Sequence, residues 1–142
     1  AEQGDDVVIG GGGNDLISGS EGNDHITGGT GNDIFISLLY IDNGQWLSNS
    51  LTSGIDVITD FVPGEDFLIF FDRNNGFAQA TRDQFDAAFG QPDGFTVDID
   101  NGNLILSWGD DSVTLEGDYT TLPATLDELE ALIGSNTILY GN

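Results

Sequence analysis

Four aspartates recur every nine residues near the start of the chain: Asp6, Asp15, Asp24 and Asp33. Each is followed two positions later by an apolar residue, and these residues are Val8, Ile17, Ile26 and Phe35. Glycine stands at the fourth place of every nine-residue unit and at the first place of three of the four units. A shared period in acidic, apolar and glycine positions indicates a repeated structural unit, so this region can fold only as a repeat architecture.

Each unit combines a turn with a very short strand. Glycine allows the positive φ and the close backbone approach of a tight turn, and the apolar residue between two polar ones suits a strand with one buried face. Two units then make one winding of 18 residues, which places each unit over the next but one. We therefore expect the apolar residues to point into a thin interior, with Asp6 above Asp24 along one edge and Asp15 above Asp33 along the other.

This stacking predicts a metal site between windings. Neighbouring strands lie about 4.8 Å apart and calcium accepts oxygen ligands at about 2.3–2.6 Å, so an ion between two windings can contact both. Magnesium requires about 2.1 Å and octahedral geometry, and transition metals prefer His or Cys. The chain has one histidine, His25, and no cysteine. Calcium is therefore the expected ion, and we expect His25 to face solvent.

The four units resemble the nonapeptide G-G-x-G-x-D-x-U-x of the RTX proteins, where U is a large apolar residue. Ala1, Glu2 and Ser20 depart from this pattern. The resemblance implies several calcium ions, each held by a carboxylate from both stacked turns and by main-chain carbonyls. These carbonyls would lie near Gln3 and Gly22 at the Asp6/Asp24 edge. At the Asp15/Asp33 edge they would lie near Gly10, Gly12, Gly29 and Gly31.

The charge of the chain agrees with a cation requirement. There are 25 acidic residues and two basic ones, Arg73 and Arg82, which gives a formal net charge of −23. Self-repulsion of this size opposes compaction, so we expect the repeats to be poorly folded until calcium binds. The same charge disfavours nucleic acid, anionic membranes and anionic substrates, unless calcium bridges them. No apolar run approaches the roughly 20 residues of a membrane span, so no membrane insertion is expected.

The segment 54–71 resembles the one that follows the repeats in serralysin-type proteases and in alginate epimerase R-modules. It alternates as a strand, turns at Pro63-Gly64 and returns as a second apolar strand. The resemblance implies that Asp56 and Asp60, and more weakly Asp66, help to close the last calcium sites. The alternative is that these three are strand-end and turn carboxylates that face solvent.

Further along the chain, local patterns predict two helices and four strands. Helices are expected over 81–89 and 125–133, each starting with a capping box (Thr81 with Gln84, Thr125 with Glu128), and the second ending at Gly134. Strands are expected over 95–100 and 104–108 around an Asn-Gly turn, over 112–117, and over 137–140. The predicted fold is mainly β: a short parallel β-roll, residues 1–36, capped by a β-rich segment with two short helices, residues 37–142, in the same domain.

The predicted function is that of a calcium-binding RTX domain at the C-terminus of a larger secreted or surface protein, such as an enzyme or an adhesin. The resemblance implies export to the cell exterior or surface by a bacterial type I secretion apparatus, with the signal within about 90–142. No catalytic constellation is visible, so the segment itself is not expected to be an enzyme. The alternative function is a calcium-dependent carbohydrate-binding module, in which Trp46, Trp108 and Tyr119 stack on sugars instead of packing in the core.

Overall fold

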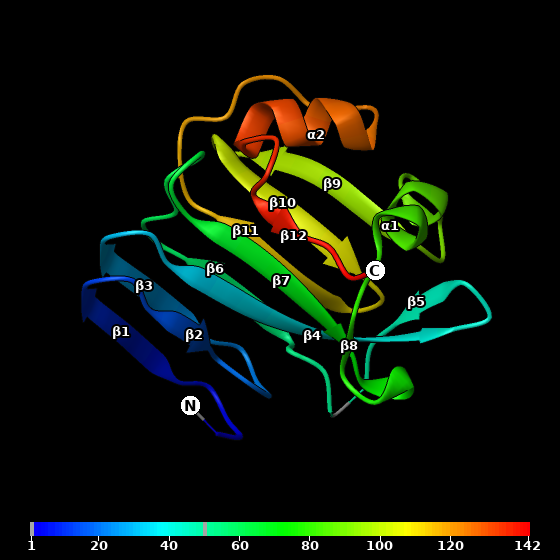
Figure 1. Ribbon diagram of the computed structural model, residues 1–142, viewed down its shortest axis with the longest axis horizontal. Helices are drawn as coiled ribbons and strands as arrows, with labels where there is room; N and C mark the ends of the chain where they lie inside the picture. Colours follow the sequence, from blue (N-terminus) through cyan, green and yellow to red (C-terminus); the bar gives the residue numbers. More distant parts are fainter. Residues whose placement is uncertain (1, 50) are drawn as a thin grey trace.

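The structure, a computed structural model, describes residues 2–49 and 51–142 and consists of two β-sheets with two helices at one end (Figure 1). The first sheet has the strand order β1 (Val7–Gly12), β3 (His25–Thr30), β6 (Ile55–Ile58), β11 (Asp111–Leu115), β10 (Asn103–Trp108), β9 (Phe95–Asp100). The second sheet has the order β12 (Ile138–Leu139), β7 (Phe67–Asp72), β4 (Ile34–Asp42), β2 (Leu16–Ser18). Two short strands extend the second sheet: β5 (Gln45–Leu47) pairs with β4, and β8 (Ala78–Gln79) pairs with β7.

The nonapeptide units form the first two windings of a parallel roll, as the nine-residue period predicts. The first winding is β1 followed by β2, and the second is β3 followed by β4. Val8 pairs with Ile26 and Ile17 pairs with Phe35, so the strand register is the expected 18 residues. Ile17, Ile26 and Phe35 are buried, and Val8 packs against the same core.

The roll continues beyond the repeats. Strand β6 lies parallel to β3 in the first sheet, and β7 lies parallel to β4 in the second, which makes 55–72 a third winding. The strand after Pro63-Gly64 therefore returns in the opposite sheet and does not pair with the strand before it. Strands β11 and β12 add a fourth winding, because each pairs in parallel with β6 and β7 respectively. The two windings of repeats are thus extended to a stack that can support itself.

The C-terminal elements follow their local sequence signals closely. Strands β9 and β10 form the predicted hairpin around Asn101-Gly102. Helix α1 (Arg82–Ala88) begins with the predicted capping box, and the 3-10 helix η1 (Arg73–Asn75) precedes it. Helix α2 (Leu126–Ile133) differs in one detail. Thr125 accepts a hydrogen bond from the Glu128 N–H, but the Glu128 carboxylate accepts from Ala124 rather than from Thr125.

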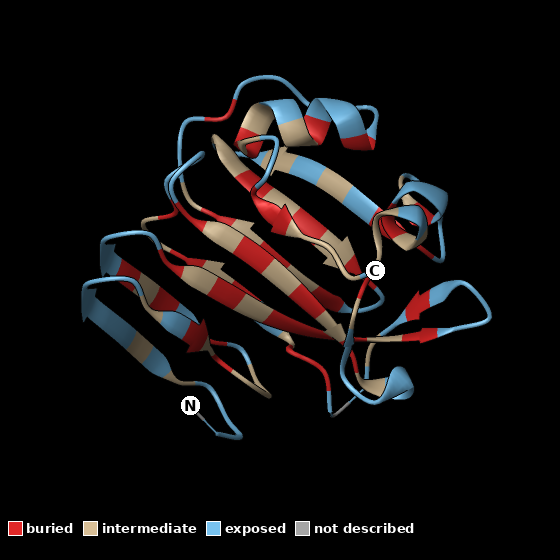
Figure 2. Cartoon of the chain, in the orientation of Figure 1, coloured by how far each residue is buried: buried red, intermediate tan, exposed pale blue. Residues whose placement is uncertain are grey.

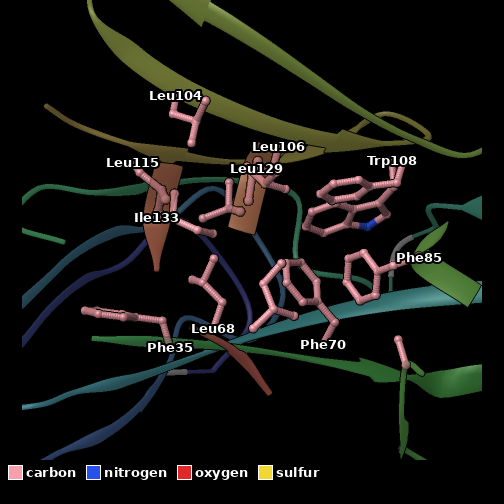
Figure 3. Close-up of a cluster of buried hydrophobic side chains, with 14 of the residues drawn as sticks. Phe35, Leu68, Phe70, Phe85, Leu104, Leu106, Trp108, Leu115, Leu129 and Ile133 are labelled. Atoms are coloured by element: carbon pink, nitrogen blue, oxygen red, sulfur yellow. The ribbon is translucent and has the colours of Figure 1, made fainter. Parts of the chain in front are cut away.

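The main core lies between the sheets at the end of the roll, under the two helices. Burial alternates along β6, β7 and β10, whereas β1 at the open end of the roll is largely exposed (Figure 2). Phe70, Phe85 and Trp108 point toward one another within this core (Figure 3). Trp46 and Tyr119 are buried as well, so the three aromatic residues considered for sugar stacking pack inside the protein.

Helices α1 and α2 contain seven and eight residues. Within the described part of the chain, no helix is long and apolar enough to cross a membrane.

Candidate metal centre

Aspartates from successive windings are stacked at the edge where β1, β3 and β6 begin. The backbone N–H of Asp6 donates to Oδ1 of Asp24 at 2.9 Å, and the N–H of Asp24 donates to Oδ1 of Asp56 at 3.0 Å. Each carboxylate therefore reaches back to the preceding winding. We call Asp6, Asp24 and Asp56 the first column; it includes one aspartate that lies outside the repeats.

A second column stands at the opposite edge, where β2, β4 and β7 begin. Here the N–H of Asp15 donates to Oδ1 of Asp33 at 2.9 Å, and the N–H of Asp33 donates to Oδ1 of Asp66 at 2.9 Å. The geometry repeats that of the first column. The structure thus brings Asp56 and Asp66 into line with the repeat aspartates, one at each edge, rather than leaving them on the solvent side of a turn.

The second oxygen of several of these carboxylates has no hydrogen-bond partner. Oδ2 of Asp15, Asp24 and Asp33 is buried and unpartnered among the described residues. Asp24 and Asp33 expose only 2% and 0% of their surface, so water does not compensate for the missing partner. A buried, unsatisfied carboxylate oxygen is costly, and it indicates that a further group completes the site.

The first glycine of each unit lies against the aspartate of the same unit. A Cβ atom at Gly19 would overlap the Asp24 carboxylate, and one at Gly28 would overlap Oδ2 of Asp33. At Gly10 the Cβ would come within 3.0 Å of Oδ2 of Asp15. Sequence reasoning selected Gly10 but missed the other two, although glycine at the first place of three units is the signal that finds them.

Other glycines hold the turns of adjacent windings in close contact. Gly29 has φ of 100°, and a Cβ there would overlap the carbonyl oxygen of Gly11 in the preceding winding. Gly31 lies against Gly13, and Gly22 against Gly4, in the same way. Gly12 has only the Thr30 hydroxyl as a neighbour, at 3.3 Å from a built Cβ. Main-chain oxygens at Gly4, Gly11 and Gly13 therefore face the next winding beside each aspartate column.

Asp60 and Asp66 use both carboxylate oxygens to bind backbone N–H groups. Oδ1 and Oδ2 of Asp60 accept from the N–H groups of Gly28 and Gly29, each at 2.8 Å. Oδ2 of Asp66 accepts from Val62 at 2.8 Å, in addition to the bond from Asp33. Both carboxylates thus hold the turn of the fourth repeat in place.

No basic side chain neutralises these columns. Arg73 pairs with Glu21 at 3.4 Å, and Arg82 pairs with Asp127 and Glu130. Burial raises the pKa of Asp24 and of Asp66, and it raises the pKa of Asp56 to about 8. Backbone hydrogen bonds lower these pKa values, but they do not offset burial and the charge of the neighbouring aspartates.

The donor set fits a hard divalent cation. Unpartnered carboxylate oxygens and main-chain carbonyls are ligands that calcium prefers, and no sulfur or imidazole lies in either column. Within residues 2–49 and 51–142, no three His, Cys, Asp or Glu side chains are grouped so that they could hold an ion. An ion here would therefore combine a pair of carboxylates with main-chain oxygens. His25, beside Asp24, is exposed.

Comparison with known families agrees with this geometry. Residues 1–35 match the RTX calcium-binding nonapeptide repeat in four copies. The first 35 residues are therefore RTX repeats, and the chain is a calcium-binding repeat domain of mainly β structure. The match describes a calcium-binding module rather than a catalytic domain.

Two solved structures are also similar to this chain, both from the mannuronan C5-epimerase of Azotobacter vinelandii. The solution structure of its AlgE6R2 subunit has 23% sequence identity and a TM-score of 0.39, and the match covers 99% of this chain and 90% of that one. The AlgE6R3 subunit has 22% identity and a TM-score of 0.32, over 96% and 78%. No curated protein matches the sequence.

Proposed function

We propose that calcium ions join the successive windings of this roll and that their binding folds the domain. The ligands are the carboxylates of Asp6, Asp24 and Asp56 in the first column and of Asp15 and Asp33 in the second. Main-chain oxygens at the glycine turns complete each site. The unpartnered, buried Oδ2 atoms of Asp15, Asp24 and Asp33 are the observation that carries this proposal.

Folding and calcium binding are coupled because each site exists only when two windings are stacked. In the unfolded chain the aspartates of one column are 18 or more residues apart, so calcium has no preformed site. Calcium also neutralises acidic groups that the two arginines do not reach. The free energy of calcium binding therefore adds directly to the free energy of folding.

The decisive experiment is a calcium titration of the metal-free chain followed by far-UV circular dichroism. We expect little regular β signal in chelator and a cooperative gain of β structure as calcium is added, with magnesium much less effective. A spectrum already folded in chelator and unchanged by millimolar calcium would refute the proposal.

We further propose that this coupling serves export of a larger protein to the cell exterior or surface through a type I secretion apparatus. A chain that stays unfolded where calcium is scarce can be threaded through a channel and can fold outside. Residues 90–142 contribute β9, β10, β11 and α2 to the folded domain, so a signal there must be recognised before folding. Export kinetics that do not respond to external calcium would argue against this role.

A second candidate function, polysaccharide binding, is supported by a groove of about 720 Å³ beside Phe77. Phe77 is 51% exposed and has φ of 61°, an uncommon backbone conformation for a bulky residue, and the Arg73 guanidinium lies 4.8 Å from its ring centroid. Glu21 and Gln3 line the same groove. An exposed ring beside polar side chains suits a neutral sugar better than a polyanion, given the charge of the chain.

Titration of neutral and acidic polysaccharides into the calcium-loaded chain tests this second function. Saturable binding that is weakened by Phe77→Ala would support it, with Leu122→Ala, another exposed apolar residue, as the control. Absence of saturable binding would leave calcium-dependent folding as the function of the domain.

A further inference from the structure

The first column continues past Asp56 into the fourth winding, but the position of the acid shifts. Val113 of β11 lies opposite Asp56 in the parallel register, so an apolar residue takes the place that aspartate holds in the three earlier windings. Asp111 comes two residues earlier and lies on the same inward face as Val113, because burial alternates along β11. An acidic side chain is thus restored beside the column, diagonally opposite Asp56.

Both of these carboxylates are buried. Asp56 is 2% exposed and Asp111 is 7% exposed. The Asp111 carboxyl group faces the Thr52 hydroxyl and the Gly54 N–H. Its Oδ2 atom is buried without a hydrogen-bond partner, which is also the condition of the repeat aspartates Asp15, Asp24 and Asp33. Asp111 therefore shares the signature that marks the repeat sites, although it lies outside the repeats.

Other buried acids show that this condition is not general in the protein. Asp72 accepts hydrogen bonds from the N–H groups of Ile41 and Asn74, both at 3.0 Å. Asp66 accepts from two N–H groups as well. Burial raises the pKa of Asp111, and the neighbouring Asp110 adds further negative charge. Since both arginines pair with other acids, no side-chain cation offsets Asp56 and Asp111.

We propose that Asp56 and Asp111 hold a calcium ion between the third and fourth windings. The choice of ion rests on the proposed function, and the site goes beyond it because neither β6 nor β11 belongs to a nonapeptide repeat. The two carboxylates supply the charge, and main-chain oxygens and water complete the coordination shell that calcium requires. Such an ion joins the roll to the β9–β11 meander and makes the folding of the cap sensitive to calcium.

The test counts calcium ions by native mass spectrometry of the folded 142-residue chain and of two matched variants. Asp111→Asn removes the charge of the buried carboxylate. Asp110→Asn removes the same charge from the exposed neighbour in the turn. We expect Asp111→Asn to carry one calcium ion fewer than the wild type and Asp110→Asn to carry the same number. Asp111→Leu, which also removes the unpartnered oxygen, keeps the test readable if Asp111→Asn folds poorly, and it is expected to lose the same ion.

A second measurement uses terbium, which replaces calcium and emits when it is excited through a nearby indole. Trp108 lies directly opposite Asp111 in the β10–β11 pair, so part of the indole-sensitised emission should disappear in Asp111→Asn and remain in Asp110→Asn. An unchanged ion count together with unchanged emission in both Asp111 variants would overturn the proposed site. A wild-type chain that binds no calcium would instead refute the proposed function.

Discussion

The repeats and the cap share the same two sheets but are held together by different interactions. In the repeats, the interior is a single row of apolar side chains, and large apolar residues such as Val7, Ile9 and Leu16 remain exposed. Buried carboxylates without a counter-charge stand at both edges. In the cap, helices and strands enclose aromatic and leucine side chains, and Phe85, Phe95, Leu104 and Leu129 are completely buried.

This difference shows how a short repeat array can belong to a stable domain. The repeat windings bury too little apolar surface to offset the chain entropy and charge repulsion of folding, so they depend on ions. The cap has a core of ordinary kind, which stabilises it through apolar burial. Parallel pairing of β3 with β6 and of β4 with β7 joins the two halves, so each stabilises the other.

The largest expected effect comes from the cap core. Phe85 is completely buried and contacts the rings of Trp46, Phe70 and Phe95 at centroid distances of 4.7, 5.2 and 5.1 Å. We expect Phe85→Ala to lower the free energy of unfolding by about 3–5 kcal/mol, because it leaves a cavity. Urea denaturation at several saturating calcium concentrations measures this loss.

For Phe85→Ala, the loss should be the same at every saturating calcium concentration, and the exposed Leu122→Ala should show almost none. A loss that shrinks as calcium rises would mean that the cap core is itself held by an ion, and it would remove the distinction between the two halves.

In the repeats, Asp33→Asn should act only through calcium. Asp33 is fully buried, and its Oδ2 has no partner, whereas Oδ1 accepts the Asp15 N–H, which asparagine can still bind. We expect the variant to lose the stabilisation from one ion, about 2.7 kcal/mol when calcium is a hundredfold above its dissociation constant. The dependence of the melting temperature on calcium concentration measures this, with the exposed Asp42→Asn as the control. An equal loss in chelator would show that Asp33 has a purely structural role.

Much of this arrangement could be predicted from sequence because it is local. The nine-residue period determines the register of β1 with β3 and of β2 with β4, and capping residues mark the starts of α1 and α2. The third and fourth windings could not be predicted, because the pairing of β6 with β11 joins segments more than fifty residues apart and has no local signal. Asp111 was missed for the same reason: within Gly109-Asp110-Asp111 it resembles a turn residue, and only the pairing of β11 makes it an inward-facing one.

The first column should also make calcium binding depend on pH. Burial raises the pKa of Asp56 from an ordinary 3.8 to about 8, so between these values the folded form holds a proton that the unfolded form releases. Without calcium, the Asp56 contribution to stability therefore falls as pH rises, by at most about 1.4 kcal/mol per unit. Calcium competes with this proton, so its affinity should rise with pH, by at most about tenfold per unit for one displaced proton.

Calorimetric calcium titrations at pH 6, 7 and 8 measure this dependence, and Asp56→Asn should flatten it. Asp86→Asn, which changes an exposed acid in helix α1, is the matched control and should keep the slope of the wild type. A wild-type affinity that does not change over this range would show that the folded chain holds no such proton.

The smallest expected effect concerns the start of α2, which lies far from both columns in the sequence. Thr125 accepts a hydrogen bond from the Glu128 N–H at 3.2 Å, and Thr125→Ala removes this cap. We expect a loss of about 1 kcal/mol, or about 3–5 °C in melting temperature, as is usual for a lost N-cap. Thr121→Ala, in the exposed loop before the helix, should change little. Because the cap is held by packing and local hydrogen bonds, this loss should not vary with calcium above saturation; a loss that grows at low calcium would mean that α2 is coupled to the ions through the roll.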